Sequence, residues 1–253
     1  MVASNRPIGS VGSASVRPVQ GQARFTVGAA ALTWFVTLMV AFGVTLTVAI
    51  LTGQADTPAD ELPGWMTAVS VTALWIPVLI GLRILSGRLG TGDFRADYGL
   101  HFRWVDLAGI PLGVLTQLVV LELVYWPLRS WFPDQFHKDA VEEPARNLFD
   151  RLNGAWLVLL VFIVVVGAPA IEELLYRGLI FRTLDGLIAP PLAVLGSALW
   201  FAAAHFQTVQ FAGLFVIGIV LAICAQRTGR LGMSIFAHAG FNATTIVYLL
   251  VSR

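Results

Sequence analysis

Two adjacent carboxylates, Glu172 and Glu173, lie within one of the most apolar runs of the chain, VVVGAPAIEELLYRGLI (164–180). A carboxylate at the centre of a membrane helix costs about 2.5–3.5 kcal/mol on insertion scales, so such groups are rare and usually face a bundle interior or a water-filled cavity. Carboxylates and imidazoles in such surroundings carry out acid–base chemistry, either as proton relays or as bases that activate water. We therefore expect a functional site here.

Helical periodicity gives the two acids different roles. Glu173 and Arg177 are spaced i,i+4 and share one helix face, which predicts an ion pair. Glu172 lies about 100° further round the helix and is not committed to that arginine. Pro169, one turn earlier, frees a backbone carbonyl and favours a kink. The pattern predicts one structural acid and one free acid.

Two later apolar runs carry the other deep polar groups of the C-terminal half. Phe201 and His205 are spaced i,i+4 in WFAAAHF, and His238 and Asn242 have the same spacing in FAHAGFNAT. The alanines and glycine between them permit close helix approach. Taken singly, each pair is equally typical of hydrogen bonding between membrane helices.

The elements that must position these residues are apolar segments. The chain has 253 residues, of which 12% are charged; about 25% is usual in a soluble domain, so much of the solvated surface is missing. In lipid the backbone must be hydrogen-bonded within its own segment, so each segment is a helix. We predict an all-α, polytopic membrane bundle of about seven (six to eight) helices, with segments at 25–51, 65–85, 104–128, 154–184, 191–206, 211–225 and 231–250. Residues 1–24 are expected to be a disordered cytoplasmic tail, and 25–253 a single membrane-embedded domain with its catalytic core at 154–250.

Turn signals and arginines predict depth and orientation. Glu172 and His205 are equidistant from the turn-forming stretch DGLIAPP (185–191), so an antiparallel helix pair brings them to one level. With the N-terminus inside, the inner segments hold eleven of the sixteen Lys and Arg residues. This bias predicts a multi-pass protein of the cell membrane with a cytoplasmic N-terminus. The net charge of +1 gives no basis for a nucleic-acid partner.

Together these motifs resemble a known family. E-E-x-x-x-R, F-x-x-x-H and H-x-x-x-N on successive apolar helices are similar to the CAAX-protease and bacteriocin-processing (CPBP, or Abi) intramembrane endopeptidases. The resemblance rests on Glu172, Glu173 and Arg177, then Phe201 and His205, then His238 and Asn242, and covers residues 154–250. It implies hydrolysis of a peptide bond in a peptide or membrane-protein substrate within the lipid bilayer.

The resemblance also implies roles. Glu172 would be the base on the attacking water, which His205 would hold or polarise. His238 and Asn242 would donate hydrogen bonds to the oxyanion, while Glu173, Arg177 and Phe201 would support them.

Two forms of this chemistry stay open. The family is usually classed with the metalloproteases, and Glu172, His205 and His238 are candidate ligands for a divalent metal such as zinc. A metal-free mechanism, in which glutamate itself activates water, has also been argued for relatives.

Two other function classes compete with proteolysis. One is a proton-coupled transporter, although the sequence shows no convincing internal repeat. The other is a non-catalytic membrane binding or immunity protein. The substrate, the oligomeric state and any role for Gln117 and Glu122 are not indicated by the sequence.

Overall fold

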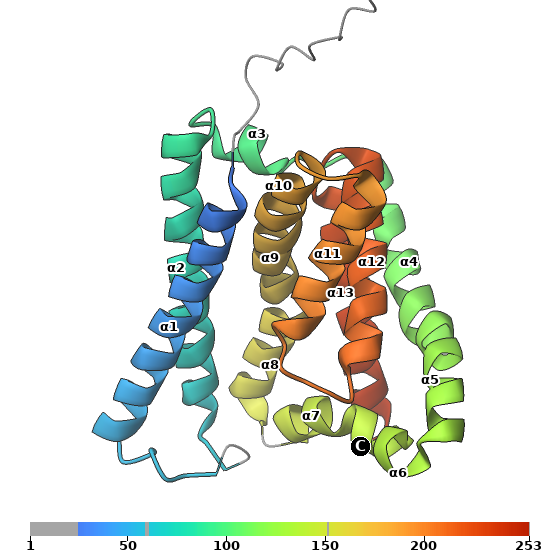
Figure 1. Cartoon of the computed structure of the whole chain (residues 1–253). Helices are drawn as coiled ribbons and strands as arrows, with labels where there is room; N and C mark the ends of the chain where they lie inside the picture. Colours follow the sequence, from blue (N-terminus) through green and yellow to red (C-terminus); the bar gives the residue numbers. More distant parts are fainter. Residues whose placement is uncertain (1–24, 59–60, 151, 253) are drawn as a thin grey trace, which may run out of the picture.

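The structure, a computed structural model, describes residues 25–58, 61–150 and 152–252 (Figure 1). Helices joined by short turns make up this part of the chain, which contains no strand, so the predicted all-α class is confirmed. The tail predicted at residues 1–24 lies outside the described residues.

The helices follow one another along the chain with few long connections. Those of the first half are α1 (Val27–Leu51), α2 (Gly64–Leu89), α3 (Phe94–Tyr98), η1 (Trp104–Ala108), α4 (Gly109–Leu115), η2 (Thr116–Val120), α5 (Leu121–Trp131), α6 (Pro133–Phe136) and α7 (Lys138–Asp150). Those of the second half are α8 (Gly154–Phe162), η3 (Ile163–Gly167), α9 (Ala168–Glu173), η4 (Leu174–Phe181), α10 (Arg182–Asp185), α11 (Pro190–Ala203), α12 (Phe211–Thr228) and α13 (Gly232–Val251).

Six helical stretches in the described residues are long and apolar enough to cross a membrane: α1, α2, η1 to α5, α8 to α10, α12 and α13. The seventh apolar helix, α11, has 14 residues, or roughly 21 Å at 1.5 Å per residue, less than a hydrocarbon core of about 30 Å. The chain after α11 continues as a loop beside α12 (Figure 1). The predicted polytopic bundle of about seven helices is confirmed.

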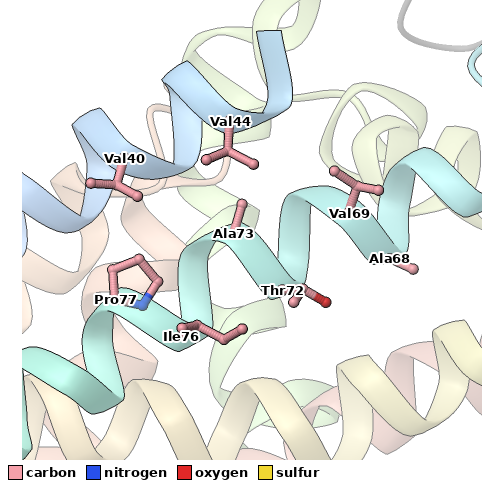
Figure 2. A pocket seen from close by; sticks show the side chains of 8 residues that line it. All are labelled: Val40, Val44, Ala68, Val69, Thr72, Ala73, Ile76 and Pro77. Atoms are coloured by element: carbon pink, nitrogen blue, oxygen red, sulfur yellow. The ribbon is translucent and has the colours of Figure 1, made fainter. Parts of the chain in front are cut away.

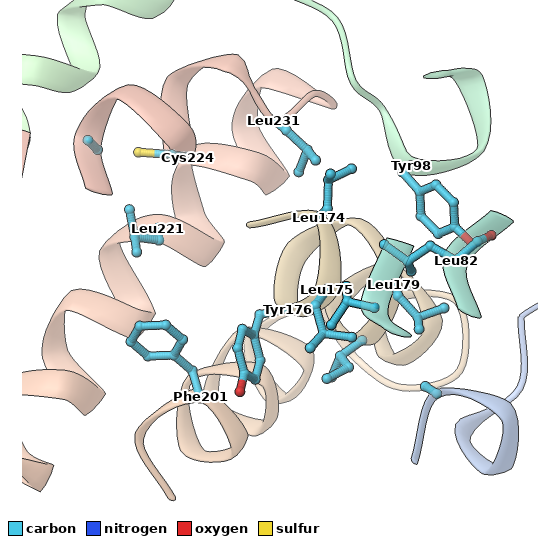
Figure 3. Packing of buried hydrophobic residues seen from close by; sticks show 14 of the residues in the cluster. Leu82, Tyr98, Leu174, Leu175, Tyr176, Leu179, Phe201, Leu221, Cys224 and Leu231 are labelled. Atoms are coloured by element: carbon cyan, nitrogen blue, oxygen red, sulfur yellow. The ribbon is translucent and has the colours of Figure 1, made fainter. Parts of the chain in front are cut away.

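The core lies where the stretch from α9 to α10 packs against α11, α12 and α13 (Figure 3). Leu179, Phe201, Leu221 and Leu231 are almost completely buried there. Many lipid-side residues of the outer helices are exposed instead, as expected for a protein whose surroundings are apolar.

Glycines bring α4 and α13 into close contact. A Cβ atom added at Gly113 would lie 1.9 Å from the Ala237 carbonyl oxygen, and one at Gly240 would lie 2.5 Å from that of Ile110. Backbones therefore meet directly along this interface, as small residues allow in membrane helices. This contact fixes the part of α13 that carries His238.

The first two helices form a pair that packs against the core through Ala30, Leu82 and the partly buried Trp34. The Trp34 indole lies edge-on to Trp200, with 5.9 Å between ring centroids. A groove of about 440 Å³ between α1 and α2 is lined by apolar residues such as Val40, Val44 and Pro77 (Figure 2). None of the predicted site residues lines this groove.

Candidate functional site

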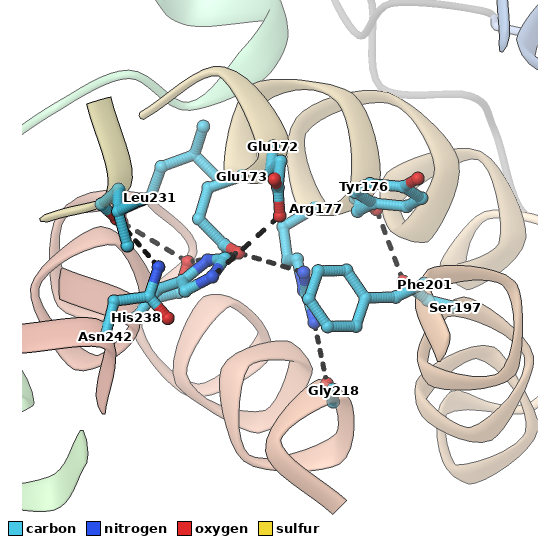
Figure 4. A network of polar contacts seen from close by, with 12 residues as sticks. Glu172, Glu173, Tyr176, Arg177, Ser197, Phe201, Gly218, Leu231, His238 and Asn242 are labelled. Atoms are coloured by element: carbon cyan, nitrogen blue, oxygen red, sulfur yellow. Dashed lines mark hydrogen bonds and ion pairs between the residues drawn. The ribbon is translucent and has the colours of Figure 1, made fainter. Parts of the chain in front are cut away.

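Glu173 is the centre of a buried polar network (Figure 4). Its side chain is completely buried at the end of α9. One oxygen, Oε1, accepts a hydrogen bond from Arg177 Nη1 at 2.9 Å and lies 3.1 Å from His238 Nδ1. The other, Oε2, accepts one from Ser234 Oγ at 2.5 Å. Three donors from two helices therefore hold this carboxylate in place.

Arg177 is the structural partner that the sequence predicts. It is fully buried, and its ion pair with Glu173 joins residues one helical turn apart. Its Nη2 atom donates to the Gly218 carbonyl at 3.0 Å, which ties η4 to α12. The guanidinium carbon also lies 4.5 Å from the centroid of the Phe201 ring, a cation–π contact. The predicted Glu173–Arg177 ion pair is confirmed.

Glu172 approaches the other ring nitrogen of His238, Nε2, whereas its neighbour Glu173 contacts Nδ1 (Figure 4). The Glu172 side chain is 25% exposed, and its Oε2 atom is buried with no hydrogen-bond partner among the described residues. This oxygen lies 3.8 Å from His238 Nε2 and 4.0 Å from His205 Nε2. The structure thus brings together three of the four residues predicted to be catalytic.

His205 lies just beyond the end of α11 rather than inside the helix that the sequence predicts. The α11 helix ends at Ala203, and residues 204–206 form a turn. His205 Nδ1 lies 2.7 Å from the Phe201 carbonyl oxygen. A carbonyl only accepts, so Nδ1 carries the proton, and in the neutral ring Nε2 is the unprotonated nitrogen that faces Glu172.

The residue after His205 has an unusual backbone. Phe206 is the one non-glycine residue in the described part of the chain with positive φ, at 54°. This conformation is strained for a bulky side chain, and such outliers cluster at functional sites. The Phe206 side chain is 77% exposed, so burial of this ring does not stabilise the turn.

His238 is oriented by a carboxylate. Glu173 only accepts, so the contact to His238 Nδ1 fixes a proton on that nitrogen and directs Nε2 toward Glu172. Phe201 covers the side of the ring, with centroids 5.8 Å apart. The predicted supporting residue Phe201 therefore contacts Arg177 and both histidines.

Ser234 belongs to the network, although sequence reasoning missed it. It is fully buried on α13, one turn before His238. The available signal was its i,i+4 spacing to His238, but serine is too common in membrane helices to be selected on spacing alone.

Asn242 takes part in a helix–helix contact. Its Nδ2 atom donates to the Val164 carbonyl oxygen at 2.8 Å. In the π-helical segment η3 the Ala168 N–H bonds to the carbonyl of Ile163, five residues earlier. The next donor in that pattern would be residue 169, which is proline and has no N–H. Asn242 therefore satisfies the carbonyl that Pro169 leaves free, and it lies beside His238 (Figure 4).

The spacing of the three facing atoms is a poor match for zinc. Ligand atoms around a tetrahedral zinc lie roughly 3.3–3.4 Å apart when each bond is about 2.0–2.1 Å. The two contacts to Glu172 Oε2 are wider, at 3.8 and 4.0 Å. Among the described residues, no group of three or more His, Cys, Asp or Glu side chains is arranged to hold a metal ion. Glu172, His205 and His238 therefore remain candidate metal ligands only, and the metal-free form of the chemistry suits this arrangement better.

The fold and the site define a multi-pass membrane protein with a buried acid–imidazole centre. Residues 154–244 match the family described as "Type II CAAX prenyl endopeptidase Rce1-like". A protein of Bacillus subtilis (strain 168), named "Putative membrane peptidase YdiL", is 23% identical over 197 residues, which cover 76% of each chain. No solved structure matches. These matches confirm the predicted resemblance to the CPBP endopeptidases, and the matched residues include all seven predicted site residues.

Proposed function

We propose that this protein is an intramembrane endopeptidase that hydrolyses a peptide bond of a membrane-associated protein or peptide. The observation that carries the proposal is the buried Glu172 oxygen that faces two imidazole nitrogens, one from the turn after α11 and one from α13. The family match and the similarity to a named membrane peptidase support the same activity.

Glu172 and His205 can both accept a hydrogen bond from an attacking water. His205 in its neutral form and the Glu172 carboxylate both present lone pairs, so a water between them donates one hydrogen to each. Its own lone pair is then directed at the substrate carbonyl carbon. Attack forms the new C–O bond, Glu172 takes the proton, and the same proton passes to the leaving nitrogen when the C–N bond breaks.

In this scheme His238 donates a hydrogen bond to the oxyanion. Its Nδ1 proton is committed to Glu173, so a hydrogen bond from Nε2 requires a second proton and a charged ring. With His238 charged, the centre contains two carboxylates, Glu172 and Glu173, and two cations, His238 and Arg177. These four side chains then carry no net charge, which is favourable where solvent is scarce. Asn242 has one amide hydrogen left for the oxyanion after its bond to Val164.

The orientation of the protein in the membrane and its domain organisation form part of the same proposal. We infer that α3 and α10 lie at the cytoplasmic end and α7 at the outer end, because the arginine-rich segments gather near the former (Figure 1). Residues 25–253 then form one domain of the cell membrane, with the core at 154–250. Single cysteines at the exposed Arg88 and Asp56 test this: an impermeant maleimide added to intact cells should label only Asp56→Cys.

The activity is tested on purified protein in lipid with a library of membrane-proximal peptides. Wild-type protein should cut at least one peptide, and Glu172→Gln should lose about 10²–10⁴-fold in rate, the usual contribution of a general base. Asp185→Asn, at an exposed carboxylate of α10 outside the site, is the matched control and should cut normally. Equal cleavage by wild type and Glu172→Gln refutes the assigned base. Peptide binding without cleavage would favour a binding protein, and proton flux into liposomes a transporter.

A further inference from the structure

A second cavity, with both apolar and polar side chains in its lining, lies away from the candidate site, among α5, α7, α12 and α13. Its volume is about 320 Å³, at the lower end of the range of ligand pockets, about 300–1,000 Å³. None of the seven predicted site residues lines it. Two lining residues nevertheless adjoin the site along the chain, because Gln207 follows His205 by two positions and Phe241 immediately precedes Asn242.

The walls of this cavity are held by polar contacts between elements. The Tyr125 hydroxyl donates to the Val209 carbonyl at 3.1 Å, which joins α5 to the loop that follows His205. Gln210 Nε2 donates to the carbonyls of Ala140 and Val141 at 3.1 and 3.0 Å, which holds α7 over the same loop. These bonds preform the cavity and connect its walls to the segment that carries a predicted catalytic histidine.

The charges around the cavity are balanced. Arg129 Nη1 pairs with Glu122 Oε1 at 2.5 Å, and Lys138 Nζ lies 3.9 Å from Glu142 Oε1. Glu142 also pairs with Arg146, which lies outside the lining, at 3.0 Å. Among the lining residues, two cations and two carboxylates leave no net charge, so neither a phosphate nor a metal cation is favoured there. A neutral, polar ligand suits the cavity better.

Two buried polar atoms of the lining have no hydrogen-bond partner among the described residues, the acceptor Gln117 Oε1 and the donor Arg129 Nε. A peptide backbone offers both a donor and an acceptor at every residue. Gln117 and Arg129 lie twelve positions apart on one helical stretch, or roughly 18 Å at 1.5 Å per residue. An extended chain spans that length with about five or six residues at roughly 3.3 Å each.

We propose that this cavity binds an extended peptide segment of the substrate, next to the substrate residues whose peptide bond enters the candidate site. The inference rests on the proposed protease function and adds a location for substrate recognition at the end of the bundle covered by α7 (Figure 1). It also gives Gln117 and Glu122, to which the sequence assigned no role, a place in a binding wall.

The test is photocrosslinking that needs no cleavage. A photoreactive phenylalanine analogue replaces Thr245, which lines the cavity, in the full-length Glu172→Gln protein in lipid. The matched control carries it at Val247, two positions along α13, exposed and outside the lining. With a biotinylated pool of membrane-proximal peptides, the variant at 245 should crosslink peptide and lose the product when excess unlabelled peptide is added. The variant at 247 should not.

Three results bear on the proposal in different ways. A crosslink from 245 to phospholipid alone, or no competed product, overturns the peptide site. A competed peptide crosslink, when wild-type protein cuts no peptide, defeats the protease proposal and leaves the peptide site standing. When a cleaved peptide is known, Thr245→Trp should raise KM with little change in kcat; unchanged KM in this folded variant also overturns the proposal.

Discussion

Replacing Ser234 by alanine removes one of the three donors that hold Glu173. The hydroxyl lies 2.5 Å from Oε2, and both side chains are fully buried, so water has no access to take its place. A hydrogen bond to a charged group contributes about 1.5–3 kcal/mol, and an unsatisfied buried acceptor adds its own desolvation cost. Ser234→Ala should therefore lower the free energy of unfolding by about 1.5–3 kcal/mol. Because Glu173 orients His238, kcat for peptide hydrolysis should fall more than KM changes.

Unfolding in mixed micelles, followed by circular dichroism over a range of SDS fractions, measures the stability change. Ser70→Ala is the matched control, since among the described residues that hydroxyl bonds only to the Met66 carbonyl of its own helix, at 2.9 Å. Such back-bonding contributes little to stability. If Ser234→Ala is no more destabilising than Ser70→Ala, the buried network around Glu173 does not exist as described.

Three further predictions concern pH, helix packing and metal. Burial alone would raise the pKa of Asp97, but hydrogen bonds from Ser86 and Thr91 outweigh it and hold the pKa below its usual value. The difference in unfolding free energy between wild type and Asp97→Asn should therefore be constant above about pH 5 and shrink as the pH falls below the usual aspartate pKa of about 3.9. A difference that stays constant down to about pH 3 contradicts this. Asn242→Leu should cost about 1–3 kcal/mol by leaving the partly buried Val164 carbonyl unpaired. Adding Pro169→Ala, which restores an N–H, should recover part of this loss, and no recovery in SDS unfolding contradicts the assignment. Activity of the purified protein should survive a strong chelator, with less than one equivalent of zinc by elemental analysis; loss on chelation and rescue by zinc would restore the metal mechanism.

Features fixed by helical periodicity were predictable from the sequence. The Glu173–Arg177 pair follows from i,i+4 spacing, and Glu172 is left outside that pair because it lies one residue earlier on the same helix. The turn between the α10 and α11 helices occurs at residues 186–189, where glycine and proline predict it. Local geometry alone sets these features, so no knowledge of neighbouring helices was needed.

Features that depend on contacts between helices were not predictable. The end of α11 at Ala203, which places His205 in a turn, follows no proline or glycine signal. For Asn242 the sequence offered an oxyanion role or a hydrogen bond between helices, but it did not indicate that the acceptor is the Val164 carbonyl across a helix boundary. Ser234 is a buried donor only because α13 packs against α9. Such roles depend on the partner helix, which spacing within one helix does not reveal.

The central claim is that Glu172 and His205 act on one water molecule, and a double-mutant cycle on peptide hydrolysis tests it most directly. Rates are measured for wild type, Glu172→Gln, His205→Asn and the double variant in lipid, with folding checked by circular dichroism. Groups that act as a unit show strongly non-additive effects. The double variant should therefore be hardly slower than the more impaired single variant. Fully additive losses, with the two fold-reductions multiplying, would show that the two side chains act independently and would contradict the proposed mechanism.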